Sequence, residues 1–148
     1  MIINSLENFK KIARKLSNKI IKSNWIFLFG EIGVGKTTFT RFLINQIQKK
    51  HNLKKTEVPS PTFNILLEYK IKNLIIEHYD FYRLKNLKQV RDLGVFYNSS
   101  VKIIEWPELI KGQVKDRIEI HLKYLEEKNH RDITIKGYGK HKKKFDVI

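Results

Sequence analysis

The chain has no cysteine among its 148 residues. It can therefore form neither a disulfide framework nor a metal site built from thiolates, which is typical of proteins in a reducing compartment. Long apolar runs are also missing: no segment reaches the length of a membrane span, and the N-terminus lacks the basic region, apolar core and small-residue cleavage site of a signal peptide. From these absences we expect a cytoplasmic protein with no membrane partner.

Acidic residues are scarce, with 15 Asp and Glu against 30 Lys and Arg and a formal net charge of +15. Clustered basic residues gain affinity for nucleic acid by releasing counterions, so the charge alone admits RNA as a partner. However, Ala13 is the only alanine and lysine far outnumbers arginine, which indicates AT-rich coding bias over the whole surface. The densest run, residues 140–144, predicts a basic, disordered tail over about residues 138–148, with a specific RNA contact as the alternative.

Glycine and proline are few, at seven and three, yet three glycines fall in the single segment Gly30-Glu-Ile-Gly-Val-Gly-Lys-Thr37. This segment is a complete G-x-x-x-x-G-K-T phosphate loop between the apolar run Trp25–Phe29 and a segment of helical period. Backbone N–H groups of such a turn, with the positive end of the following helix, make a cradle for polyphosphate. The segment predicts binding of ATP or GTP; an ordinary glycine turn that starts a helix is the alternative.

The residue types within this loop suit separate tasks. Gly30, Gly33 and Gly35 lack a Cβ, so the backbone can adopt positive φ and approach phosphate oxygens closely. Lys36 is expected to interact with the β- and γ-phosphates, and the hydroxyl of Thr37 to ligate Mg²⁺. The nucleotide contacts that we expect here are Gly30, Glu31, Ile32, Gly33, Val34, Gly35, Lys36, Thr37 and Thr38.

A nucleotide hydrolase also needs an acidic residue close to the magnesium ion, at the end of a buried strand. Glu105 ends an apolar run and precedes Trp106 and a proline, which fix a sharp exit from the strand. We expect Glu105 to ligate Mg²⁺; a carboxylate that faces solvent is the alternative. Asp80 follows another apolar run and is expected to position the attacking water or a magnesium-bound water, unless it only caps a turn.

The pattern of apolar residues predicts a single domain, residues 1–148, of the α/β class. We expect a P-loop NTPase-like three-layer sandwich whose central sheet is mostly parallel and ends in an antiparallel C-terminal hairpin. Ser5 is the expected N-cap of the first helix, whose apolar face begins at Leu6. Strands are predicted at residues 25–29, 62–69, 74–79, 101–104, 117–124 and 132–136, and a short helix at residues 87–93.

Four segments, in this order and spacing, resemble the bacterial TsaE family, formerly called YjeE. They are the phosphate loop through Thr38, Ser60-Pro-Thr-Phe63, His78-Tyr-Asp-Phe-Tyr-Arg83 and Ile104-Glu-Trp-Pro-Glu108, and the similarity runs from about Ser5 to about Lys136. The resemblance implies a small ATPase of the machinery that builds threonylcarbamoyladenosine beside the anticodon of tRNAs reading codons that begin with A. It also implies a partner, the heterodimer of the transferase TsaD and TsaB, whose repeated turnover is supported by ATP hydrolysis. Contact with tRNA is expected only indirectly or through the basic tail.

The resemblance also implies roles for single residues. Lys36 and Thr37 are then the phosphate and Mg²⁺ residues, Glu105 is the second Mg²⁺ residue, and Asp80 belongs to the motif tied to hydrolysis. Thr62 lies in a loop that behaves like a switch, where its hydroxyl could sense the γ-phosphate; a hydroxyl that simply starts a strand is the alternative. Each of these assignments depends on ATP and Mg²⁺ as the cofactors.

The resemblance places five further residues near these. Trp106 lies next to the nucleotide in similar proteins, although core packing explains it nearly as well. Leu6 and Arg131 are our choices for contacts with adenine. We interpret His78 as a packed, hydrogen-bonded core histidine and Arg83 as the partner of a nearby carboxylate.

The segment between Arg83 and Gly94 departs from the family, where it is usually acidic, because Asp92 is its only acidic residue here. Two other functions remain open from the sequence. A small-molecule kinase would need an arginine-rich lid, which is not visible, and a nucleic-acid switch would depend on the basic tail alone.

Overall fold

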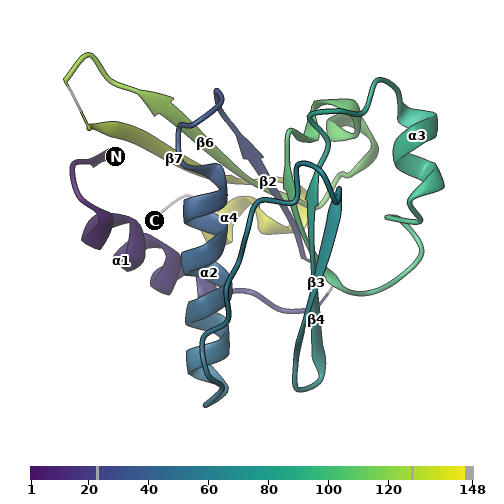
Figure 1. The fold of residues 1–148 in the computed structure, drawn as a ribbon, viewed down its shortest axis with the longest axis horizontal. Helices are drawn as coiled ribbons and strands as arrows, with labels where there is room; N and C mark the ends of the chain where they lie inside the picture. Colours follow the sequence, from purple (N-terminus) through teal and green to yellow (C-terminus); the bar gives the residue numbers. More distant parts are fainter. Residues whose placement is uncertain (23, 128, 146–148) are drawn as a thin grey trace.

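The computed structural model describes residues 1–22, 24–127 and 129–145. The strands are β1 (Ile2–Ile3), β2 (Trp25–Phe29), β3 (Leu66–Ile71), β4 (Leu74–Asp80), β5 (Val101–Glu105), β6 (Ile118–Tyr124) and β7 (Arg131–Gly137). Within the described residues they form one sheet in the order β1-β7-β6-β2-β5-β4-β3 (Figure 1). The central strands β6, β2, β5 and β4 are parallel, whereas β7, β1 and β3 pair antiparallel at the two sides. The predicted C-terminal hairpin is thus β6 with β7.

Helices lie on both faces of this sheet (Figure 1). The larger core packs α1 (Leu6–Ser17) and α2 (Lys36–Lys50) against one face. On the other face α3 (Leu87–Asp92) packs with the short helix η1 (Pro107–Leu109), and Ile110 and Val114, on either side of η2 (Lys111–Gln113), join the same core. Strand β2 serves both cores, because Ile26 and Leu28 point to the first and Phe27 to the second. The α/β class and the layered P-loop NTPase-like arrangement predicted from the sequence are confirmed.

Helix α1 begins as its sequence predicts. The Ser5 hydroxyl accepts a hydrogen bond from the backbone N–H of Asn8 at 3.3 Å, and Glu7 stands in the first turn, where a negative charge is favourable. Leu6 departs from the prediction, since it is 63% exposed and lies outside the buried stripe that starts at Phe9. Among the described residues, no helix is both long enough and apolar enough to cross a membrane.

The strand predicted from residue 62 was placed too early, because β3 begins only at Leu66. Before it, the backbone N–H of Ile65 donates to the Pro61 carbonyl at 2.6 Å and closes a turn. Ile65 has φ 67°, in the left-handed region that a β-branched residue rarely adopts. This turn keeps Thr62 out of the sheet and leaves its side chain free to face the end of β4.

The prediction of a disordered tail from residue 138 is wrong for residues 138–145. They form η3 (Gly139–His141) and α4 (Lys142–Phe145), and Phe145 is completely buried in the same core as α1. His141 packs edge-to-face on Phe145 at 5.7 Å. One buried aromatic residue is enough to anchor a segment that its lysines alone would leave in solvent. Residues 146–148 of the predicted tail lie outside the described residues.

Candidate functional site

The phosphate loop stands at the carboxyl end of β2, at the edge of the sheet where the parallel strands end. Gly30, Gly33 and Gly35 have φ of 143°, 75° and 119°, so all three adopt the positive φ that the sequence predicted for them. At Gly30 a Cβ would lie 2.5 Å from the carbonyl oxygen of Leu122 and 2.8 Å from Val34 Cγ1. The backbone of β6 therefore lies directly against this turn and leaves no room for a side chain larger than that of glycine.

Lys36, the first residue of α2, points back across the loop. Its Nζ donates to the carbonyls of Gly30 and Glu31, at 2.6 and 2.9 Å, and lies 3.9 Å from the centre of the Trp106 ring. Burial lowers the pKa of Lys36, and the charges of nearby carboxylates, Glu105 first, oppose the decrease. A polyanion bound in the loop would also oppose the decrease, because negative charge favours the ammonium form.

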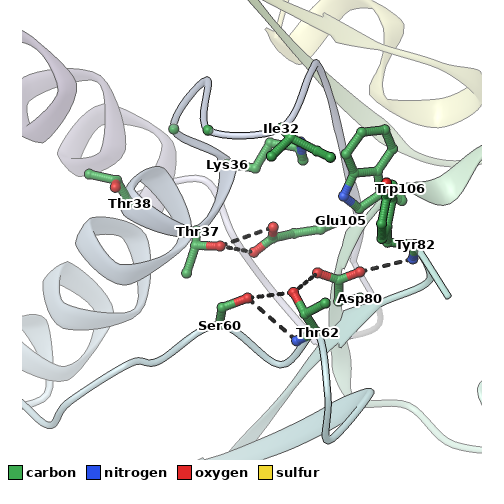
Figure 2. Close-up of a pocket in the computed structure, with 12 residues that line it drawn as sticks. Ile32, Lys36, Thr37, Thr38, Ser60, Thr62, Asp80, Tyr82, Glu105 and Trp106 are labelled. Atoms are coloured by element: carbon green, nitrogen blue, oxygen red, sulfur yellow. Dashed lines mark hydrogen bonds between the residues drawn. The ribbon is translucent and has the colours of Figure 1, made fainter.

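Glu105 connects the loop to the strand edge (Figure 2). The Thr37 hydroxyl donates toward both of its carboxylate oxygens, at 2.9 and 3.0 Å. His78 Nε2 lies 2.8 Å from Glu105 Oε1, and the histidine is completely buried. The prediction of a packed, hydrogen-bonded core histidine is confirmed, but its contact with Glu105 was not foreseen.

Asp80 ends β4 directly beside Glu105 on β5, since the two residues are paired in register. Its Oδ2 accepts from the Thr62 hydroxyl at 2.9 Å and its Oδ1 from the Tyr82 backbone N–H at 2.9 Å, while Ser60 Oγ lies 2.8 Å from Thr62 Oγ1 (Figure 2). Burial raises the pKa of Asp80, although the hydrogen bonds from the Tyr82 backbone and the Thr62 hydroxyl oppose the increase. Asp80 therefore caps a turn and also faces the cavity, and its predicted role in positioning water stays a prediction.

These side chains surround a cavity of about 300 Å³. Trp106 forms one wall with φ 59°, which turns the chain sharply out of β5, and its ring lies 4.8 Å from the ring of Tyr82. The lining residues are Ile32, Gly33, Gly35, Lys36, Thr37, Thr38, Ser60, Thr62, Asp80, Tyr82, Glu105 and Trp106. The cavity thus brings together Lys36, Thr37, Thr38, Thr62, Asp80 and Glu105 with Ile32, Gly33 and Gly35 of the loop, whereas Gly30, Glu31 and Val34 of the loop do not line it. Ser60 and Tyr82 also line the cavity, although no role was predicted for them.

A second cavity of about 390 Å³ continues from the first, since Gly33, Gly35 and Thr38 line both. Leu6 and Arg131, the residues predicted for adenine, both line this second cavity although the chain separates them by most of its length. Arg131 is held by the ring of Tyr124, 4.3 Å from its guanidinium carbon, and donates to the Val34 carbonyl at 3.3 Å. The structure brings the two residues together beside the phosphate loop.

Arg83 does not take the predicted position beside a carboxylate. Its guanidinium carbon lies 5.4 Å from the centre of the Phe63 ring, and within the described parts of the chain it makes no ion pair with a carboxylate. Phe63 is 81% exposed, so this contact joins two loops at the surface, near the mouth of the cavity. The aromatic residue next to Thr62 was the sequence signal for this alternative.

The residues present fit Mg²⁺ bound together with a nucleotide. Mg²⁺ prefers oxygen ligands and in phosphoryl-transfer sites takes only one or two carboxylates, completing its shell with phosphate and water. The Thr37 hydroxyl and the Glu105 carboxylate offer such oxygens at the phosphate loop. In the parts of the chain that the structure describes, no three His, Cys, Asp or Glu side chains converge to hold an ion by themselves. A metal here would therefore depend on ligands from the nucleotide and water.

The fold and the site together define an α/β protein of the P-loop NTPase-like class. A phosphate loop joins β2 of a mostly parallel sheet to helix α2, and the neighbouring strands β4 and β5 end in the carboxylates Asp80 and Glu105. Comparison with known proteins gives the family. The model of the family described as threonylcarbamoyl adenosine biosynthesis protein TsaE matches residues 3–133. The chain belongs to the TsaE family.

Individual relatives agree with this assignment. The chain is 37% identical over 130 residues to the tRNA threonylcarbamoyladenosine biosynthesis protein TsaE of Rickettsia felis, covering 86% of this chain and 74% of the relative. It is 31% identical to the TsaE protein of Bacillus subtilis, over 90% of this chain and 82% of that protein. The crystal structure of Bacillus subtilis YdiB superposes with a TM-score of 0.71 and 27% identity, over 97% of this chain and 88% of that one.

Proposed function

We propose that this chain is a Mg²⁺-dependent ATPase required for the threonylcarbamoyladenosine modification of tRNA, acting in the cytoplasm. In this proposal the chain binds the TsaD–TsaB heterodimer, and hydrolysis of ATP supports repeated turnover of that transferase. The observation that carries the proposal is the contact of Thr37 Oγ1 with both oxygens of Glu105, at the entrance of the phosphate loop. A hydroxyl and a carboxylate side by side at the phosphate loop would supply oxygen ligands for a nucleotide-bound Mg²⁺.

The residues would divide the work as follows. The loop backbone and Lys36 bind the phosphates, and Thr37 with Glu105 holds Mg²⁺, which neutralises charge on the phosphate oxygens when it is bound. Asp80 accepts a hydrogen bond from the attacking water and orients it. Thr62, which donates to Asp80, would move with the loop from Ser60 when phosphate contacts change.

Dependence on a partner is supported by what lines the cavity. No arginine is among the described residues that line it, although phosphoryl transfer is commonly accelerated by an arginine that stabilises the developing charge. We therefore expect slow hydrolysis by the isolated chain and stimulation when TsaD and TsaB are bound. Leu6 and Arg131 would hold the adenine in the adjoining cavity.

The test is phosphate release from Mg·ATP by the chain alone and with its own TsaD and TsaB plus tRNA. Stimulation by the partners supports the proposal; no stimulation, with both partners shown to be active, overturns the partner part. Affinity for a fluorescent ATP analogue tests the site separately. Lys36→Ala should lose at least about 30-fold in affinity because a buried charge contact is removed, and Lys85→Ala, an exposed lysine that does not line the cavity, should lose none.

A further inference from the structure

Of the segments that carry basic residues and no acidic residue, two lie toward the two ends of the chain. Residues 8–30 contain Lys10, Lys11, Arg14, Lys15, Lys19 and Lys22, and residues 133–145 contain Lys136, Lys140, Lys142, Lys143 and Lys144. The segments lie at opposite ends of the sequence, so the sequence alone gives no reason to treat them as one surface.

The fold joins the two segments. Lys19, just beyond α1, donates from Nζ to the carbonyl of Lys144 at 2.8 Å and lies 5.5 Å from the centre of the Phe145 ring. Because Phe145 is completely buried, α4 is fixed beside the end of α1. The segment that follows β7 is therefore a folded part of the surface, and its lysines have defined positions.

The exposed side chains on this part of the molecule form what we call the α1–α4 surface: Lys11, Lys15, Lys142, Lys143 and Lys144. Lys11 and Lys15 are about one turn apart on the exposed side of α1, and Lys19, which contacts α4, follows the end of this helix. Lys142 also lines a cavity of about 720 Å³ along the edge of β7.

The charges on this surface are not neutralised by neighbouring carboxylates within the described residues. Lys10 with Glu7, at 3.8 Å, and Lys140 with Asp116, at 3.9 Å, are the ion pairs at its borders. The next acidic residue after Asp132 is Asp146, outside the described residues. The same lysines affect a buried side chain. Burial lowers the pKa of His141, and the positive charges of Lys140 and Lys144 lower this pKa further.

We propose that the α1–α4 surface binds RNA through its phosphate backbone. A row of unpaired lysines is complementary to a polyanion and gains affinity from counterion release. Among the lysines of α1 and α4 no aromatic side chain is exposed within the described residues, since Phe9 and Phe145 are buried. Leu6, at the start of α1, and Ile21, after its end, are exposed, so a membrane surface is the alternative that the test must separate. With no base-stacking side chain on the surface, recognition is expected to be tolerant of sequence.

This inference goes beyond the proposed ATPase function and does not depend on it, because the α1–α4 surface uses none of the residues of the ATP cavity. The alternative to a defined RNA-binding surface is that RNA is attracted only by the net charge of +15, wherever the basic residues lie. A matched pair of triple variants separates the two. Lys15→Gln, Lys142→Gln and Lys143→Gln remove three charges from the surface. The control, called the α3 variant, is Lys85→Gln, Lys88→Gln and Arg91→Gln, which removes three charges from α3 and the residue before its N-cap, on the opposite face of the sheet.

The probe is an unmodified tRNA transcript, titrated with the full chain over a range of salt concentrations. The surface variant should reduce the slope of log affinity against log salt by about 2 to 3, and the α3 variant should change it by less than about 1. Equal losses in the two variants, or no loss in the surface variant, overturn the proposal. Binding to anionic lipid vesicles that the surface variant abolishes, with tRNA binding unchanged, overturns it in favour of a membrane. All six side chains are exposed, so circular dichroism should show both variants folded.

Discussion

His78 lies completely buried with its Nε2 at 2.8 Å from Oε1 of Glu105, the carboxylate that also accepts from Thr37. With the carboxylate oxygen as acceptor, Nε2 is the donor, so the histidine fixes the position of a side chain that faces the phosphate loop. Its Nδ1 has no hydrogen-bond partner within the described residues. Within the described residues, the hydrogen bond of the His78 ring is therefore the one to Glu105.

Replacing His78 should therefore weaken the Mg²⁺-dependent part of nucleotide affinity. In His78→Leu, Glu105 keeps its charge but loses its donor, and we expect about 10-fold weaker binding with Mg²⁺. Affinity measured in excess chelator should change little. His78→Gln can restore a donor and should recover part of the loss. An unchanged Mg²⁺ dependence in folded His78→Leu would show that the contact serves packing only.

Asp80 can be separated into its two tasks by two substitutions. Asp80→Asn keeps an oxygen that can accept from Tyr82 N–H, so the unfolding free energy should change little, but the loss of the second carboxylate oxygen should slow hydrolysis about 100-fold. Asp80→Ala should also lose about 1 kcal/mol of stability with the turn cap. ATP affinity should be close to wild type in both. Normal hydrolysis by Asp80→Asn would leave only the capping role.

Gly30 and Gly112 offer a matched pair for the phosphate loop. Gly30→Ala should destabilise the protein by about 2 kcal/mol, because its φ of 143° and the nearby Leu122 carbonyl both disfavour a Cβ. Gly112→Ala should be within about 0.5 kcal/mol of wild type, since nothing lies within 4 Å of its Cβ position. Denaturant unfolding measures both. Equal effects at the two glycines would contradict the close contact with β6.

Glu119 should make stability depend on pH at the acidic end. Burial by itself would raise its pKa, but the hydrogen bonds of His121 and Arg117, with the charge of Lys111, hold the pKa below the usual value. A depressed folded pKa means that the ionised group stabilises the fold above the ordinary glutamate range, and that this contribution is lost as the pH falls below about 4.

The corresponding measurement compares wild type with Glu119→Gln by chemical unfolding between neutral and acidic pH. Wild type should be more stable by about 2 kcal/mol at neutral pH, and the difference should shrink as Glu119 is protonated. Glu126→Gln, at an exposed position, should show no such pH-dependent difference. A difference for Glu119→Gln that stays constant down to acidic pH would rule out the ion cluster as its cause.

Phe145 should anchor the C-terminal segment. Phe145→Ala leaves a cavity in the core shared with α1 and should cost about 3 kcal/mol in the free energy of unfolding. Lys143→Ala, at an exposed position two residues earlier in the same helix, should change the free energy of unfolding by less than about 0.5 kcal/mol. If both substitutions were neutral, the segment after β7 would not be part of the core.

Much of this molecule follows from local patterns in the sequence. The capped first helix, the strand before the phosphate loop and the C-terminal hairpin are predicted by periodicity, and the family by four short motifs. Errors occurred where contacts distant in sequence decide the outcome. The Ile65 carbonyl accepts from the backbone N–H of Asp80 on β4, which helps to fix where β3 begins, and Arg83 contacts the ring of Phe63 in place of a carboxylate.

Local sequence is enough to predict a phosphate-binding turn, because the glycines, Lys36 and Thr37 lie within a few positions of one another. It could not place Glu105 against Thr37 or His78, bring Leu6 to Arg131, or dock α4 on α1. Those pairings are decided when β2, β4 and β5 align in a parallel sheet and the helices close over the core. Residues far apart in the chain meet only through this packing, and no local preference records it.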